Sequence, residues 1–288
     1  MKYGVIDIGS NSVRLLISEN GKNLIKTLNV TRLAEGKKDG LLCPQSSLRT
    51  LKAVSEYALT ARECAVDEIY AFATAAVRNA LNGKEFTDRV KEVCGVTVDV
   101  LSGELEAEIG LLGALSGKDG AVLDIGGGST EIAVCKNGVC AYHKSIPVGA
   151  VVLTDKFGQD SAQIIGYARR AVRDFGDVPH ISQSDKYCIG GTCTSLAAVS
   201  LKLDVYDAEK VNGYKFTLSG ISRLTQAISA LSVSERKGLA GLQKERADII
   251  HAGACIFQAV AEYIGAESFT VSESDNLEGY LKYITEKK

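Results

Sequence analysis

The chain has 288 residues, with 33 Lys and Arg against 35 Asp and Glu, and 45% hydrophobic positions. This composition is typical of a globular protein and excludes a disordered or fibrous one, while the length predicts about two domains at roughly 150 residues each. A formal net charge of −2 provides no global basic field, so nucleic acid is not expected as a partner, and an anionic ligand needs a local site.

The elements, taken in chain order, begin with a β-hairpin at residues 4–17. A β-branched run ends in Asp7, a polar glycine-containing turn follows, and a second run alternates like a strand. The next expected elements are a helix at 46–65, a strand at 68–74, a helix at 84–94, a strand at 96–101 and a helix at 103–115. The polar segment at 116–120 then interrupts the pattern.

A second copy of the hairpin opens the second half of the chain. Residues 121–134 repeat the pattern of residues 4–17, and Asp124 stands 117 positions after Asp7. The elements expected after it are strands at 139–147, 187–189 and 268–271, helices at 150–157, 161–175 and 276–283, and mainly helices over 191–263. This order predicts two α/β domains, each opening with a hairpin and facing the other across a cleft.

The two hairpin turns predict phosphate binding. Glycines let the main chain approach a ligand and direct several N–H groups into one concavity, where an anion is favoured. The residues expected to do this are Gly9, Ser10, Asn11 and Ser12 in the first turn, and Gly126, Gly127, Gly128, Ser129 and Thr130 in the second. Because each turn joins two strands, the dinucleotide fold and the P-loop, whose glycines open a helix, are excluded. The alternative is a pair of tight hairpins with Asx-turn chemistry.

Asp7 and Asp124 each end the strand before a turn. A carboxylate in that place would repel a bare phosphate, which indicates that a divalent cation stands between the acid and the anion. The three histidines are scattered, so no zinc site is expected.

Glu106 stands apart from the other acids of the expected helix at 103–115. At about 100° per residue, Glu104 and Glu108 share one face, whereas Glu106 lies roughly 160–200° away, beside Gly110. A carboxylate at the edge of an apolar surface, with room for a ligand, can act as a general base. The alternative is that all three acids simply pair with the helix dipole.

Three further features have both a functional and a structural interpretation. Arg78 follows a strand and small residues, and could equally be a surface guanidinium. Gly191 and Thr192 open a helix after a strand, and could hold an anion or form a turn with an N-cap. Residues 244–248 start a helix, either as a source of a cation or, more simply, as a solvated first turn.

Five motifs occur in a recognisable order: Asp-Ile-Gly-Ser-Asn-Ser at 7–12, the segment 74–78, Ser-Gly-x-x-Glu-Ala at 102–107, Asp-Ile-Gly-Gly-Gly-Ser-Thr-Glu at 124–131, and Arg-Ala-Asp at 246–248. Together they resemble the exopolyphosphatase/guanosine pentaphosphate phosphatase family, within the superfamily of actin, sugar kinases and heat-shock ATPases. The resemblance covers nearly the whole chain.

The resemblance implies two ribonuclease H-like (actin-like ATPase) domains, with the active site in the cleft between them. The first would comprise residues 1–117 plus about 275–288, with the C-terminal helix packed back onto it, and the second residues 118–274. The chain is similar to a short form of the family, because longer members continue into an all-helical extension. Glu108 stands where the family usually has an arginine.

Residue by residue, the resemblance implies that Glu106 orients or deprotonates the attacking water. It also implies that Asp124 and Glu131 are associated with the metal, and that Asn11 and Arg78 contact phosphate. The cofactor would be Mg²⁺ or Mn²⁺.

The function expected from these motifs is metal-dependent release of terminal orthophosphate from inorganic polyphosphate. Such hydrolysis requires an in-line water, charge neutralisation and positioning more than covalent catalysis. Guanosine pentaphosphate 5′-phosphohydrolysis would use the same site. The motifs are also compatible with an ATP-dependent small-molecule kinase and with a non-enzymatic, actin-like binding module. We expect a cytoplasmic location, since the eight cysteines form no Cys-x-x-Cys pair and no secretory signal or membrane segment is recognisable. No membrane partner is expected, and a homodimer is possible from the resemblance.

Overall fold

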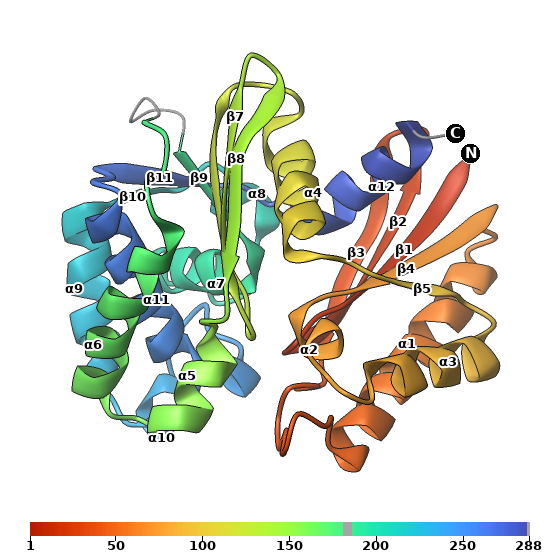
Figure 1. Cartoon of the computed structure of the whole chain (residues 1–288), viewed down its shortest axis with the longest axis horizontal. Helices are drawn as coiled ribbons and strands as arrows, with labels where there is room; N and C mark the ends of the chain where they lie inside the picture. Colours follow the sequence, from red (N-terminus) through yellow and green to blue (C-terminus); the bar gives the residue numbers. More distant parts are fainter. Residues whose placement is uncertain (181–185, 287–288) are drawn as a thin grey trace. The chain divides into compact units, whose positions relative to one another are not determined.

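The computed structural model describes residues 1–180 and 186–286 (Figure 1). The chain divides into two compact units, Met1–Glu106 with Asn276–Lys288, and Ala107–Asp275. Each unit is built on a mixed β-sheet with helices, which is the α/β class that the sequence predicts. Helix α4 (Gly103–Leu115) begins in the first unit and continues in the second. The domain limits drawn from the resemblance, at 117/118 and about 274/275, stay predictions.

The sheet of the first unit has the strand order β3-β2-β1-β4-β5. Its strands are β1 (Lys2–Ile8), β2 (Ser12–Glu19), β3 (Lys22–Val30), β4 (Glu68–Ala73) and β5 (Val98–Val100). The first three form an antiparallel meander, and β4 and β5 continue the sheet in parallel. The expected hairpin is confirmed as β1–β2. Strand β3 was not expected, because it is a mostly exposed edge strand without a regular apolar face.

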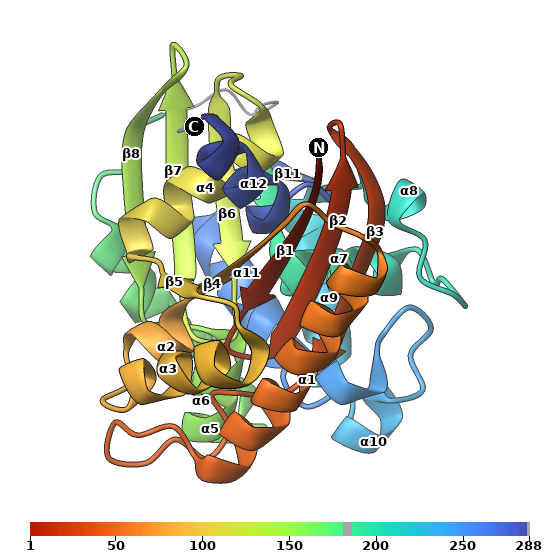
Figure 2. The same cartoon turned by 90° about the vertical axis from the view of Figure 1, so that its right-hand side faces the viewer.

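The helices of the first unit are α1 (Pro44–Glu63), α2 (Ala75–Arg78), α3 (Gly83–Cys94) and α12 (Asn276–Glu286). Helices α1 and α12 lie against opposite faces of the sheet (Figures 1 and 2). On the α1 face, a Cβ added to Gly4 would lie 3.1 Å from the Ala61 Cβ. On the other face, the ring of Tyr280 lies 4.6 Å from that of Phe72. The last helix of the chain therefore belongs to the core of the first unit.

The sheet of the second unit has the order β10-β11-β9-β6-β7-β8. Its strands are β6 (Gly120–Ile125), β7 (Thr130–Lys136), β8 (Val139–Ile146), β9 (Lys186–Ile189), β10 (Lys215–Thr217) and β11 (Ser268–Val271). Read from its other edge, β8-β7-β6-β9-β11 has the same order as the first sheet, so the sequence repeat is a repeat of structure. Strand β10 lies in the segment where mainly helices were expected, and it was not predicted because three residues are too short to show an alternation.

The helices of the second unit include α11, which is largely apolar. They are α5 (Ala150–Phe157), α6 (Ser161–Ala171), α7 (Gly190–Ser200), α8 (Ala208–Val211), α9 (Leu218–Ser229), α10 (Val233–Arg236) and α11 (Ile250–Tyr263), with 3₁₀ turns η1 (Val172–Phe175) and η3 (Lys244–Arg246). Helix α11 packs against α5, α6, α7 and α9, as expected for a helix that is apolar on nearly all sides.

The helix expected to start at Lys244 does not start there. Residues Lys244–Arg246 form the separate turn η3, and α11 begins only at Ile250. Across residues 1–180 and 186–286, no helix is both long and apolar enough to span a bilayer.

Candidate active site

The turn between β6 and β7 has its carbonyl groups tied to the start of α5. Ala150 N donates to Gly126 O at 2.9 Å, and Val151 N donates to Gly127 O at 3.0 Å. Within the described part of the chain, no hydrogen bond engages the N–H groups of residues 127–129. The carbonyl groups of the turn therefore fix its position, while its N–H groups remain able to bind a ligand. This is the arrangement of a main-chain anion site.

Gly149 makes this close approach possible. A Cβ at this position would lie 2.3 Å from the main-chain carbonyl of Gly127, so any larger residue would push α5 away from the turn. The Thr130 hydroxyl is not among the available donors, since it already donates to Val148 O at 2.5 Å.

The turn between β1 and β2 is built in the same way. The main-chain N–H of Ala34 donates to Ser10 O at 2.9 Å, and that of Arg32 donates to Asn11 O at 2.8 Å. The N–H groups of Ser10 and Asn11 have no acceptor among the described residues. The Asn11 side chain is buried, with 6% exposed, and neither its Oδ1 nor its Nδ2 has a hydrogen-bond partner in the described structure. A buried polar group left unpaired in this way costs about 1–3 kcal/mol, and a bound ligand would offset that cost.

The residues opposite the two strand-end acids differ between the copies. Asp7 lies in register with Arg14, whose Nε and Nη2 donate to Asp7 Oδ2 at 2.8 and 2.5 Å. Asp124 lies in register with Glu131, so two carboxylates share one face of the hairpin. The charge of Asp7 is compensated by Arg14 on the neighbouring strand, whereas the corresponding pair in the second unit consists of two carboxyl groups.

Asp124 and Glu131 fit a Mg²⁺ or Mn²⁺ ion by their donor chemistry. Both supply hard carboxylate oxygens, and directly opposed strand residues have Cβ atoms only about 4.5–5.5 Å apart. Glu131 is 3% exposed. No group of three or more His, Cys, Asp or Glu side chains that could hold a metal occurs in residues 1–180 and 186–286. Two carboxylates with phosphate oxygens and water are the usual ligand set for Mg²⁺.

Two glycines at the start of α7 allow the side chains of Asp124 and Arg246 to approach the helix closely. Gly190 has a φ of 80°, and a Cβ on it would lie 2.3 Å from Asp124 Oδ1. A Cβ on Gly191 would lie 2.5 Å from Arg246 Nη2. Arg246 is buried and packed against Gly191, so the interpretation as a solvated turn is wrong for this residue, whereas Lys244 and Glu245 are exposed.

Thr192 packs inward from the same turn. It is 5% exposed, and a Cβ on Gly253 of α11 would lie 2.5 Å from its Cγ2 methyl. The methyl group thus fills the close contact between α7 and α11.

Glu106 and Arg78 form an ion pair in the first unit. Arg78 Nη1 donates to Glu106 Oε2 at 2.7 Å and to Leu101 O at 2.9 Å. The side chains of Glu106 and Arg78 are 7% and 19% exposed, respectively, so Arg78 is not a surface guanidinium. Glu104 and Glu108 are exposed, and the separation of Glu106 from them that helical geometry predicts is confirmed.

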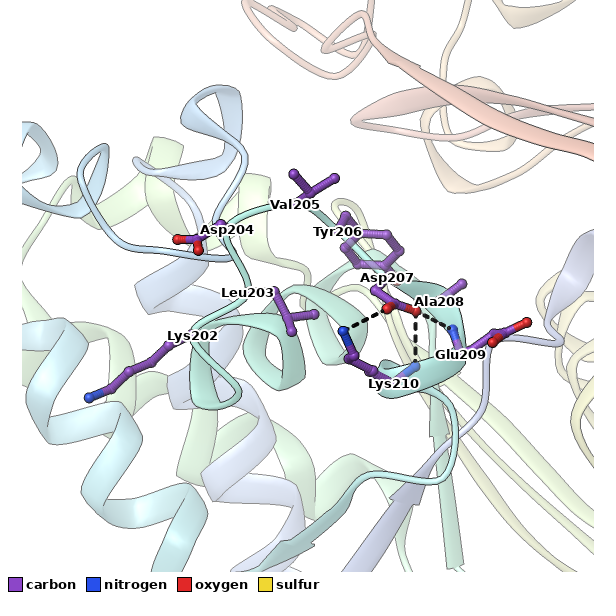
Figure 3. A pocket seen from close by; sticks show the side chains of 9 residues that line it. All are labelled: Lys202, Leu203, Asp204, Val205, Tyr206, Asp207, Ala208, Glu209 and Lys210. Atoms are coloured by element: carbon purple, nitrogen blue, oxygen red, sulfur yellow. Dashed lines mark hydrogen bonds and ion pairs between the residues drawn. The ribbon is translucent and has the colours of Figure 1, made fainter.

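A hollow of about 640 Å³ lies in the second unit (Figure 3). Its lining consists of residues 202–210, and it contains none of the side chains singled out in the sequence. Asp207 accepts main-chain N–H groups from Glu209 and Lys210 and forms an ion pair with Lys210 Nζ at 3.0 Å (Figure 3). This acid stabilises the first turn of α8.

These features define an α/β protein with a duplicated hairpin whose turns present main-chain N–H groups without an acceptor in the described structure. The chain belongs to the Ppx/GppA phosphatase family, whose model matches residues 14–287. The enzyme class, a hydrolase acting on phosphoanhydride bonds, is thereby the one that the sequence predicted, and neither the kinase nor the binding module has support.

Two curated relatives and one solved structure illustrate the match. The chain is 29% identical to Exopolyphosphatase 2 of Mycobacterium tuberculosis, over 96% of this chain and 97% of that protein. It is 30% identical to the Bifunctional 3-dehydroquinate synthase/phosphatase of Fusobacterium nucleatum over 98% of this chain, but spans only 46% of that protein. The crystal structure of the Aquifex aeolicus Ppx/GppA family member has a TM-score of 0.82 and 30% identity, covering 100% of this chain and 98% of that one. The fold class drawn from the resemblance is confirmed.

Proposed function

We propose that the enzyme releases terminal orthophosphate from inorganic polyphosphate with the help of Mg²⁺ or Mn²⁺. The observation that carries this proposal is the pair of hairpin turns whose carbonyls accept hydrogen bonds from the following segment, while the N–H groups of residues 10–11 and 127–129 have no acceptor in the described structure. A linear polyanion offers repeated phosphate groups to such donors. End-to-end similarity to a protein named Exopolyphosphatase 2 also supports it.

The turns would hold the phosphates of the substrate. The main-chain donors would be the N–H groups of Ser10 and Asn11 in the first unit and of Gly127, Gly128 and Ser129 in the second, because the N–H groups of Gly9 and Gly126 already donate to Ser12 O and Ser129 O at 3.0 Å. The unpaired Asn11 amide would complete its hydrogen bonds on a phosphate oxygen. The start of α7 at Gly191 and the neighbouring Arg246 would hold a further anionic group.

Glu106 would take the proton of the attacking water. A general base of this kind contributes typically 10²–10⁴-fold to the rate. Arg78 compensates the charge of the buried Glu106 carboxylate through the 2.7 Å ion pair and keeps it in one orientation. We assign Arg78 a second role in stabilising negative charge on the phosphoryl group.

Asp124 and Glu131 would hold the divalent cation, which when bound neutralises charge on the terminal phosphates. Asp7 is also a metal candidate in the sequence, but we propose that it pairs with Arg14 instead of binding the cation, because that guanidinium already compensates its charge.

We propose a cytoplasmic location for the enzyme, since all eight cysteines are free thiols.

Glu106→Gln tests the proposal, with Glu104→Gln as the matched control on the exposed side of the same helix. We expect phosphate release from polyphosphate with Mg²⁺ to fall at least 100-fold in Glu106→Gln and to change less than about threefold in Glu104→Gln. Retention of most activity by a folded Glu106→Gln enzyme would contradict the assignment of the base.

Guanosine pentaphosphate is the second candidate substrate, because its 5′-terminal phosphate would meet the same groups. Direct competition between polyphosphate and guanosine pentaphosphate, at equal concentrations of terminal phosphate, decides between them. Preferential consumption of the nucleotide would overturn polyphosphate as the substrate while leaving the assignment of Glu106 intact.

A further inference from the structure

Ser145 makes a short hydrogen bond to one of the two paired carboxylates. Its hydroxyl donates to Glu131 Oε1 at 2.6 Å. Ser145 stands on β8 directly opposite Glu131 on β7, which itself stands opposite Asp124 on β6. The three residues thus form one row across β6, β7 and β8, which are neighbouring strands of one sheet.

The repeat within the chain supplies a comparison for this row. The corresponding row of the first unit is Asp7, Arg14 and Leu28, at the same positions in β1, β2 and β3. In the first unit, Arg14 pairs with Asp7, and the residue on the other side of Arg14 is the apolar Leu28. In the second unit, Glu131 lies beside another acid, Asp124, and the residue on its other side is Ser145, a hydroxyl donor.

The pairing of Asp124 with Glu131 creates a problem of orientation. Two carboxylates on adjacent strands repel each other, and a glutamate has three side-chain torsions by which it can turn away. Glu131 is 3% exposed, so bulk water has little access to hold it. The Ser145 hydroxyl fixes Oε1 and thereby the plane of the carboxylate.

We propose that Ser145 is a positioning residue that holds the Glu131 carboxylate in the orientation needed to receive a divalent cation together with Asp124. This inference rests on the metal site of the proposed function. Ser145 acts through Glu131 and supplies no ligand itself. Loss of a hydrogen bond that orients a metal ligand typically weakens metal binding 10- to 100-fold.

The test is Mn²⁺ binding to the enzyme in the absence of substrate, followed by the electron paramagnetic resonance of free Mn²⁺. We expect Ser145→Ala to weaken binding at least tenfold and Ser145→Thr, which keeps the hydroxyl, to stay within about threefold of wild type. Ser18→Ala is the matched control, since Ser18 is a buried strand serine whose hydroxyl donates to a carbonyl, Lys22 O, at 3.2 Å. It should bind Mn²⁺ like wild type.

A second readout separates positioning from general damage. The Mg²⁺ concentration for half-maximal phosphate release should rise at least tenfold in Ser145→Ala, while the rate at saturating Mg²⁺ changes less than about threefold. Wild-type Mn²⁺ affinity in a folded Ser145→Ala enzyme, with weakened affinity in Asp124→Asn, would overturn the role of Ser145 alone. Unchanged affinity in both variants, or no binding by wild type, would overturn the metal site as well.

Discussion

Asp7 and Asp124 hold the same position in the two copies of the hairpin, yet their neighbours give them different chemistry. Arg14 binds Asp7 with two donors on the adjacent strand. Glu131 occupies the corresponding place beside Asp124. The duplicated motif thus pairs an acid with a base-type side chain, arginine, in one copy and with a second acid in the other, and the difference rests on a single position.

Asp7→Asn is expected to lower the free energy of unfolding by roughly 3 kcal/mol, because it leaves the Arg14 guanidinium, 17% exposed, without its carboxylate. Urea denaturation measures the change. The control is Glu35→Gln, whose exposed ion pair with Arg49 should contribute less than about 1 kcal/mol. Equal stability of Asp7→Asn and wild type would mean that the pair contributes nothing to folding.

At the scale of elements, α12 closes a face of the first sheet although it is the last element of the chain. Tyr280 is 1% exposed, its ring packs on Phe72, and its hydroxyl donates to Asp99 Oδ2 at 2.5 Å. Burial and the charge of Asp99 raise the pKa of Tyr280, so the phenol stays protonated and remains a donor. Lys26 Nζ contacts Glu278 Oε1 at 3.0 Å and anchors the start of the helix.

Tyr280→Ala is expected to lower the free energy of unfolding by about 3–5 kcal/mol, because it removes a large ring from the core. Tyr280→Phe keeps the ring and should cost only about 1 kcal/mol for the lost hydrogen bond. Urea denaturation followed by circular dichroism compares the two. A Tyr280→Ala protein as stable as wild type would show that α12 is not part of this core.

At the scale of the whole molecule, acid should destabilise the fold through His251. This residue is fully buried in α11. Burial and the positive charge of Arg236 lower the pKa of His251 from 6.5 to about 4. The folded chain therefore keeps the ring neutral where the unfolded chain would protonate it. The resulting contribution to stability, about 3 kcal/mol, is complete above pH 6.5 and is lost as the pH falls through about 4.

We expect the free energy of unfolding of wild type to decline between pH 6.5 and 4, and His251→Leu to show a shallower decline over the same range. Denaturant unfolding at several pH values measures both slopes. The exposed His180 is the control, and His180→Gln should keep the wild-type slope. Identical slopes for His251→Leu and wild type would exclude His251 as the source.

The hairpins, α4 and the inward face of Glu106 could be predicted because they depend on local periodicity. Alternation with a period of two marks β1–β2 and β6–β7, and the helical angle separates Glu106 from Glu104 and Glu108. Strands β3 and β10 could not be predicted in this way. The first is an exposed edge without a clear apolar face, and the second has three residues whose pairing with β11 is set elsewhere in the chain.

The sequence by itself determined the duplicated hairpins and the α/β class, since residue type and spacing carry both, and the resemblance of its five motifs indicated the phosphatase family. Only the tertiary structure decided which side chains became partners. The ion pair of Asp7 with Arg14 is local to a hairpin, whereas its contrast with the pair of Asp124 and Glu131 follows from comparing two sheets. The hydrogen bond from Ser145 to Glu131 and the packing of Arg246 on Gly191 join different elements. The register of the β7–β8 hairpin brings Ser145 to Glu131, and loop packing brings Arg246 to Gly191, 55 residues earlier in the chain. Neither pairing follows from residue type and local periodicity alone.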